Sequence, residues 1–228
     1  MEDIDAIAVL QDPVRRRLYE YVAAQGREVG RNEAAEAAGV ARTLAAHHLD
    51  RLTEAGLLES GSRRLTGRSG PGAGRPAKVY TRARTEHSVS LPARDYRTAA
   101  ELLAEAAEEA GIDAGLCAAA RRRGEALRGS AAPCRDLDEA RRLLAARGYE
   151  PYPEDPDGEA TAGRGGTVVR MRNCPFHAVA ERFPPLVCGM NLALLEGLLG
   201  AGGPVRARMD PRPGECCVVV EDSKNNED

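Results

Sequence analysis

The segment between residues 29 and 60 constrains the fold more than any other part of the chain. Two short helical stretches are separated there by a turn at Gly39. The first is predicted to begin at the capping residue Asn32, and the second to run from about Ala41 to Ala55, where Gly56 ends it. Two short helices joined by a Gly-containing turn form a helix-turn-helix.

The apolar residues around this motif indicate which sides are buried. In the second helix the apolar side consists of Leu44, Leu49 and Leu52, with His48 at its edge, where packing is expected. A preceding helix, also with apolar residues at helical spacing, is predicted to open on a proline after the capping residue Asp12. The strand-like segments LLES and KVYTR follow, and they predict a two-stranded wing.

The tip of this wing is strongly basic. Residues 60–84 hold six arginines and one lysine without an acidic residue, although the whole chain has a net charge of −3. A segment with this bias most often meets a phosphate backbone. A solvated basic loop is the alternative.

A helix-turn-helix places the N-terminal part of its second helix at base edges in the major groove of DNA. Side chains that face outward on that helix are predicted to contact bases or phosphates: Arg42, Thr43, His47 and Arg51. Arg42 suits a bidentate contact to guanine. Wing side chains are predicted to contact phosphates or the minor groove: Arg63, Arg64, Arg68, Arg75 and Lys78.

The remainder of the chain predicts an α+β fold. Residues 92–128 are helical, with apolar residues at Ala99, Leu102, Leu103, Ala106 and Ala110. Gly111 and Gly115 indicate a break before the segment IDAGLCAAARRRGEALRG. A helix from Leu137 to Arg147, a long apolar helix over 186–199 and strands at TVVRMRN, VRARMD and CCVVVE follow. We expect a DNA-binding domain over 1–90, a helical linker and dimerisation region over 91–133, a cysteine-containing α+β sensor domain over 134–222 and a disordered tail over 223–228.

Four of the six cysteines lie at junctions between predicted elements of the last domain: Cys174, Cys188, Cys216 and Cys217. Such positions can converge at one end of a sheet, as metal ligands must. No CxxC is present, and the spacing is not that of a zinc finger. A metal or cluster site, buried structural thiols and a redox disulfide therefore stay open. Cys117 is expected to be a small buried hydrophobe, and Cys134 lies in a loop.

AxxAGVARTLAAHHLDRLTEAGLLES together with GRPAKVY resembles bacterial winged-helix repressors of the ArsR-like kind. In those proteins a helix in the position of residues 92–110 packs against its mate in a dimer. With NCPFHAVAERFPPLVC and the later GECC, the chain looks like the SufR family, which binds an iron–sulfur cluster through three cysteines. This resemblance implies Cys174, Cys188 and Cys216 as ligands of a [2Fe-2S] or [4Fe-4S] cluster. Cys217, His177 and Asp210 are candidates for the fourth ligand.

The sequence therefore predicts a homodimeric transcriptional regulator, a repressor, that binds a palindromic operator in double-stranded DNA and senses iron or redox status. The first alternative keeps DNA binding but places Zn²⁺ or a small apolar ligand in the C-terminal domain. A thiol-redox enzyme is the second. No catalytic set emerges, so an enzyme is not expected. The N-terminus lacks a signal-peptide layout and no run is apolar enough to span a membrane, so a cytoplasmic location is expected.

Overall fold

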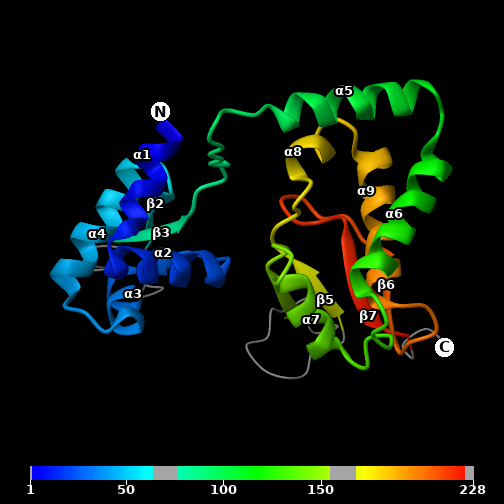
Figure 1. The fold of residues 1–228 in the computed structure, drawn as a ribbon. Coiled ribbons are helices and arrows are strands. Elements are labelled where there is room, and N and C mark those ends of the chain that lie inside the picture. The colour runs from blue at the N-terminus through cyan, green and yellow to red at the C-terminus, as the bar shows by residue number, and fades with distance from the viewer. Residues whose placement is uncertain (1, 64–75, 155–167, 224–228) are drawn as a thin grey trace. The chain divides into compact units, whose positions relative to one another are not determined.

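The fold was obtained as a computed structural model, which describes residues 2–63, 76–154 and 168–223. The chain is mixed α+β and divides into two compact units, Met1–Arg94 and Asp95–Asp228, each of which is described by itself (Figure 1). Most of the predicted basic wing tip and most of the predicted tail lie outside the described residues. No helix in the described ranges is long and apolar enough to cross a membrane.

The N-terminal unit combines short helices with a three-stranded antiparallel sheet. Its elements are α1 (Glu2–Ala8), the 3-10 helix η1 (Val9–Gln11), α2 (Pro13–Gln25), β1 (Val29–Gly30), α3 (Arg31–Ala38), α4 (Arg42–Glu54), β2 (Leu58–Arg63) and β3 (Ala77–Arg82). Strand β3 lies between β1 and β2. The predicted helix-turn-helix is confirmed as α3 and α4, and the predicted wing as β2 and β3; β1 is a third strand that the sequence did not indicate.

Caps and glycines determine where these helices begin and end. The Asp12 carboxylate accepts two hydrogen bonds from N–H groups in the first turn of α2 (2.8 and 3.0 Å), which confirms it as the cap. Gly39 ends α3 in the left-handed region (φ 66°), which glycine adopts at little cost. The prediction that Asn32 caps α3 is wrong. That helix begins at Arg31 after Gly30, which has no side chain to act as a cap.

Helix α4 packs into the N-terminal core through one side. Leu49 and Leu52 are fully buried and His48 lies beside them, as predicted, and Ala45 is buried with them. Burial lowers the pKa of the His48 imidazole, which favours a neutral ring. The prediction that Leu44 shares this side is wrong: its position precedes the buried stripe by one residue, about 100° around the helix, and Leu44 is 42% exposed.

The C-terminal unit combines five helices with a four-stranded antiparallel sheet within its described residues. Its elements are α5 (Tyr96–Glu109), α6 (Asp113–Arg128), α7 (Leu137–Ala145), β4 (Pro151–Glu154), β5 (Val168–Met171), α8 (His177–Ala180), α9 (Pro184–Leu199), β6 (Val205–Met209) and β7 (Val218–Asp222). The strand order is β4-β5-β7-β6. The predicted strands and the long apolar helix are confirmed. Strand β7, however, begins after the cysteine doublet instead of including it.

The two faces of this sheet differ in polarity because side chains alternate along each strand. One set, which includes Val169, Met171 and Val220, packs into a core with residues of α7 and α9. The alternate positions carry charge. Arg170 on β5 is only 1% exposed, and Glu221 on β7 is also buried. The sheet therefore has an apolar face toward the helices and a charged face.

Helices α6 and α9 approach each other closely through two glycines. A Cβ on Gly124 would lie 2.2 Å from the backbone oxygen of Leu194, and one on Gly197 would lie 2.2 Å from that of Arg121. Real Cβ atoms essentially never come so close to other atoms. Glycine at both positions therefore allows the two backbones to pack directly against each other.

Helix α5 leaves its predicted apolar stripe uncovered within this unit. Leu103 is 72% exposed and Leu102 is exposed beside it, whereas Ala104 is buried against Phe183 and its neighbours. The break after α5 lies at Gly111, as predicted. Helix α6 then begins at Asp113 and includes Gly115.

Candidate functional site

The exposed side of α4 carries the four residues predicted to contact DNA. Arg42, Thr43, His47 and Arg51 are all exposed. Arg51 forms an ion pair with Glu54 (2.9 Å). Arg42 forms no ion pair with any residue in the described part of the chain, so its guanidinium is available at the start of the helix. The contact of these residues with DNA stays a prediction.

A groove of about 1230 Å³ lies beside the start of α4, between α3 and the wing. Its basic lining residues are Arg27, Arg31, Arg42, Arg63 and Lys78. Its acidic lining residues are Glu28 and Glu33. The positive excess and the position beside the exposed side of α4 make this groove the candidate surface for a phosphate backbone.

Asp50 on α4 joins the groove's helices to its wing. Its carboxylate lies 3.1 Å from the Arg31 guanidinium and 2.7 Å from the Lys78 ammonium, and it accepts a hydrogen bond from the Tyr80 hydroxyl (2.6 Å). Burial, together with this hydrogen bond, raises the pKa of Tyr80 to about 12. Two cations share one carboxylate here, so one positive charge remains for an incoming phosphate.

Sequence reasoning predicted only Lys78 from this group. Arg31, Asp50 and Tyr80 lie on three different elements, and no local pattern links positions so far apart in the chain. Arg63 on the wing lies 3.4 Å from the Glu28 carboxylate and is otherwise exposed. The predicted contacts Arg64, Arg68 and Arg75 lie outside the described residues.

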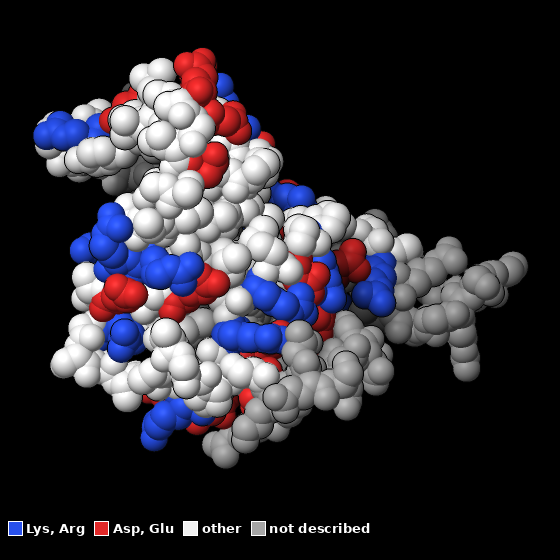
Figure 2. Space-filling model, turned by 90° about the vertical axis from the view of Figure 1, so that its right-hand side faces the viewer, with Lys and Arg blue, Asp and Glu red and all other residues white. Residues whose placement is uncertain are grey.

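Charges in the C-terminal unit are arranged differently. Arg121 pairs with Glu196 (2.6 Å), and Arg141 pairs with Asp138 (3.2 Å). Figure 2 shows one face of the molecule, on which Lys and Arg lie beside Asp and Glu among the coloured atoms. Interspersed charges attract a phosphate backbone weakly, so this face is not a candidate DNA surface.

The second candidate site is a group of four thiols, which we call the thiol cluster: Cys174, Cys188, Cys216 and Cys217. Cys216 lies close enough to Cys174 to shift the pKa of its thiol, and Cys217 lies close enough to Cys188 to shift the pKa of that thiol. All four cysteines are free. The connection after β5, the first turns of α9 and the loop before β7 therefore bring their cysteines together.

The two members of each pair differ in burial, and the pKa values of Cys174, Cys188 and Cys216 are shifted. The proximity of Cys216 lowers the pKa of the Cys174 thiol, helped by the backbone N–H of Phe176. The proximity of Cys174 and burial raise the pKa of Cys216, which is 2% exposed. Burial and the proximity of Cys217 raise the pKa of Cys188 to about 12. Each pair thus joins a buried thiol to a partly exposed one.

A buried amide fixes one sulfur of the cluster. The Asn191 side chain, one turn after Cys188 on α9, donates a hydrogen bond to the Cys216 sulfur (3.4 Å). Its carbonyl oxygen accepts a hydrogen bond from the Tyr149 hydroxyl (2.5 Å). Asn191 and Tyr149 are both buried. Sequence reasoning treated 186–199 only as an apolar helix, and its single amide was the signal that could have identified this contact.

Other candidate ligands have partners elsewhere. The His177 side chain is 61% exposed and lies 3.2 Å from the Glu181 carboxylate. Asp210 pairs with Arg170 and Arg208. In residues 2–63, 76–154 and 168–223, no three His, Cys, Asp or Glu side chains form a group that could hold a metal ion as they stand.

Of the cysteines outside the thiol cluster, Cys134 lies in a loop as predicted, whereas Cys117 differs from expectation. Cys117 on α6 is partly exposed, so the prediction that it is buried is wrong. Its sulfur lies 3.7 Å from where a Cβ on Gly189 would be. Cys134 is buried in the core of the C-terminal unit, and its N–H donates to the Leu199 carbonyl (2.8 Å).

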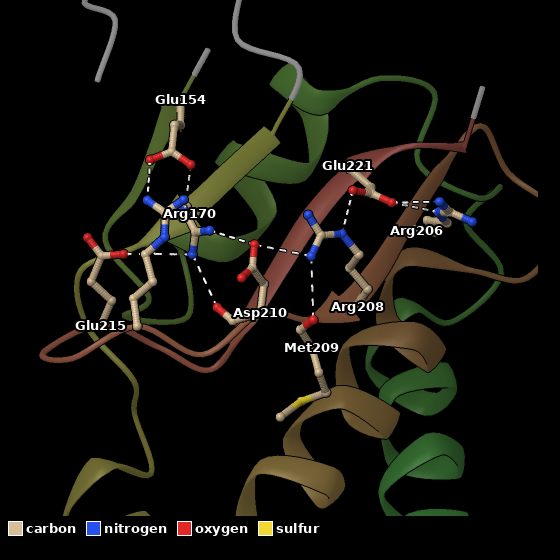
Figure 3. A network of polar contacts seen from close by, with 9 residues as sticks. Glu154, Arg170, Arg206, Arg208, Met209, Asp210, Glu215 and Glu221 are labelled. Carbon is tan, nitrogen blue, oxygen red and sulfur yellow. Dashed lines mark hydrogen bonds and ion pairs between the residues drawn. The ribbon is translucent and has the colours of Figure 1, made fainter. Parts of the chain in front are cut away.

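A charged network holds the loop that carries Cys216 and Cys217 (Figure 3). The Arg170 guanidinium lies 2.6 Å from Glu154, 2.6 Å from Asp210 and 3.9 Å from Glu215. Glu215 also accepts a hydrogen bond from the Tyr152 hydroxyl (2.5 Å). Because Glu215 immediately precedes Cys216, the network on the charged face of the sheet anchors the start of the cysteine doublet.

Comparison with known proteins identifies one domain. A family model described as a helix-turn-helix domain matches residues 10–61, which span α2, α3, α4 and the start of β2. No curated protein and no solved structure matches the chain. The match supports an ArsR-like helix-turn-helix regulator, and with it DNA binding and transcription regulation.

Proposed function

We propose that this chain is a repressor that places α4 in the major groove of a palindromic operator. The observation that supports this role is the exposed Arg42 at the start of α4, which forms no ion pair with another described residue and lies beside a groove lined mainly by cations. In this arrangement Arg42 reads a guanine, and the groove receives the adjacent phosphates. Arg63 on the wing then contacts phosphate, which positions the protein on the duplex without sequence preference.

This role predicts different losses for base-reading and phosphate-contacting residues. With an operator selected from random duplexes, Arg42→Ala should weaken specific binding by about 1–3 kcal/mol and change nonspecific binding little. Arg63→Ala should weaken both and reduce the salt slope by about one. Arg122→Ala, at an exposed position of α6, is the matched control and should change neither. Equal losses for Arg42→Ala on operator and random DNA would reject its role in base reading.

We further propose that the C-terminal unit holds an iron–sulfur cluster through Cys174, Cys188 and Cys216, with Cys217 as the fourth ligand. The thiol cluster fits such a group chemically, because thiolates are the soft ligands that iron–sulfur clusters take. Cys217 is preferred to His177 because it contacts Cys188, whereas His177 contacts Glu181 on the exposed side of α8.

Neighbouring residues of the chain would assist such a site. Asn191 donates to the Cys216 sulfur and would reduce the charge on that ligand. Arg170, through Glu215, anchors the loop of the doublet. A bound cluster supplies electron transfer and sensitivity to oxidants. Its loss would free the connection after β5, α9 and the loop before β7 from one another.

Four thiols also suit Zn²⁺, which prefers a tetrahedral set of sulfur ligands. Visible absorption of protein purified without oxygen separates the two. An iron–sulfur cluster absorbs in the visible, whereas Zn²⁺ does not. A colourless protein that carries one zinc per chain would replace the cluster proposal with the zinc alternative.

We propose that α5 forms the contact between two copies of the chain. Its exposed apolar side chains support this, because Tyr96, Leu102 and Leu103 would otherwise stay in water. A dimer also matches the two half-sites of a palindromic operator. Size-exclusion chromatography with light scattering tests this, and a monomer at all concentrations would reject it.

A further inference from the structure

Leu44 is an apolar side chain that lies among polar neighbours on the outward side of α4. It is 42% exposed, although leucine is among the residues that are most often buried. Within α4, all of which the structure describes, it is the one large apolar side chain that is exposed. A single exposed leucine elsewhere on a protein needs no explanation. This one lies in the first turn of the helix that we propose to enter the major groove, and its position gives it a role.

Leu44 faces the same side of α4 as residues already assigned to DNA. Leu44, His47 and Arg51 occupy positions i, i+3 and i+7, which form one stripe along a helix, and all three are exposed. Leu49 and Leu52 are buried on the other side. Side chains on a helix lean toward its N-terminus, and the N-terminal part of a recognition helix lies at the base edges. Leu44 is therefore directed at the bases and not at the core.

A leucine side chain can recognise one feature of the major groove. The edges of guanine, adenine and cytosine present hydrogen-bond donors and acceptors there, whereas thymine also presents a C5-methyl group. Leucine has neither a donor nor an acceptor in its side chain, so it gains only from apolar contact. Next to a guanine or an adenine it would cover N7 and leave that acceptor without its water, which costs affinity.

We propose that Leu44 reads a thymine in each half-site of the operator through the C5-methyl group of that base. This inference rests on the proposed function, in which α4 lies in the major groove. It adds an apolar contact that selects thymine to the polar contact through which Arg42 selects guanine.

Arg42 and Leu44 would read different bases. The helical repeat places them about 200° apart around α4. Arg42 lines the groove beside the wing, whereas Leu44 is not among the described residues that line it. Contacts to separate base pairs contribute to affinity roughly additively. Arg42→Ala should therefore weaken binding to thymine and deoxyuridine operators by the same factor.

Replacing thymine by deoxyuridine tests the contact, because it removes the methyl group and leaves the base pair unchanged. Burial of one such group contributes about fourfold in affinity, or about 0.8 kcal/mol. With an operator selected from random duplexes, the wild type should lose this factor for each half-site that is substituted at one thymine position. Leu44→Ala should bind the unmodified operator more weakly and should bind the two operators equally. Leu44→Met keeps an apolar side chain and should retain discrimination.

Three further measurements separate the contact from other effects. Leu127→Ala is the matched control, because Leu127 on α6 is also 42% exposed, and it should change neither affinity. Thr43→Ser removes a neighbouring methyl group but keeps the hydroxyl, and it should retain discrimination. Leu44→Ala should unfold at the urea midpoint of the wild type, because it removes no buried side chain. Its weaker binding would then not be a loss of fold.

Two results would overturn the inference and leave the proposed function standing. The first is an operator whose affinity for the wild type changes at no position when its thymines are replaced. The second is discrimination that persists in Leu44→Ala, or that is lost in Thr43→Ser instead. A chain that selects no operator at all would reject the proposed function, and this inference with it. The two failures are therefore distinguishable.

Discussion

Gly124→Ala tests the direct packing of α6 against α9. The new Cβ would lie 2.2 Å from the Leu194 oxygen and 2.7 Å from the Leu198 nitrogen. Both are backbone atoms, so neither can rotate away as a flexible side chain would. The two helices must therefore move apart along the contact that orders the C-terminal unit, and α9 also carries Cys188 of the thiol cluster.

Two opposing effects determine the magnitude. Alanine favours a helix over glycine by about 1 kcal/mol, which alone would stabilise the variant. Overpacking a filled contact costs about 1–3 kcal/mol, and more where backbone must shift. Two backbone clashes place this cost at the upper end, so we expect a net loss of about 1–2 kcal/mol. Gly115→Ala in the same helix meets nothing within 4 Å and isolates the favourable effect, about 0.5–1 kcal/mol.

Urea unfolding followed by far-ultraviolet circular dichroism measures both variants against the wild type. The midpoint should fall for Gly124→Ala and rise for Gly115→Ala. The opposite signs of the two midpoint shifts are a stronger test than their sizes, because both substitutions add one methyl group to α6. If Gly124→Ala were as stable as Gly115→Ala, the close approach of the two helices would be refuted.

Further predictions concern a cap, a pH dependence and the dimer. Asp12→Ala should lower the unfolding midpoint because two N–H groups of α2 lose their acceptor, whereas Asp12→Asn keeps a cap oxygen and should stay near the wild type in the same urea assay. Burial alone would raise the pKa of Glu154, Asp210 and Glu221, but their arginine partners outweigh it and hold each pKa below its ordinary value. The three ionised carboxylates therefore stabilise the fold above the ordinary carboxyl pKa of about 4. This stabilisation is lost as the pH falls through that value toward the lowered pKa values of the folded state. A urea midpoint that stayed constant from pH 6 to pH 3 would contradict this. Leu103→Glu should raise the dimer dissociation constant at least about tenfold, or 1.4 kcal/mol, in sedimentation equilibrium, and an unchanged constant would exclude α5 from the interface.

Much of the fold was accessible from the sequence because local signals agree with it. Asp12 caps a helix that opens on proline, and Gly39 supplies the left-handed turn of the helix-turn-helix. Leu44 shows where such reasoning fails. An apolar residue one position away from a buried stripe cannot be assigned to it by hydrophobicity alone.

The candidate sites divide in the same way. The period of a single helix is enough to identify its outward-facing residues. The sequence therefore predicts the exposure of side chains such as Arg42. The partners of Asp50, and the contact of Asn191 with Cys216, depend on elements brought together by tertiary packing. The proximity of the four thiols also depends on tertiary packing. The spacing of the cysteines along the sequence could not decide whether Cys217 is a ligand.

Iron and acid-labile sulfide content of protein purified without oxygen tests the central claim most directly. Wild-type protein and Cys117→Ser should contain both iron and acid-labile sulfide. Cys174→Ser, Cys188→Ser and Cys216→Ser should each lose them, because each removes a thiolate ligand. Wild-type protein without iron and sulfide, or three variants that retain both in full, would contradict a cluster held by these cysteines.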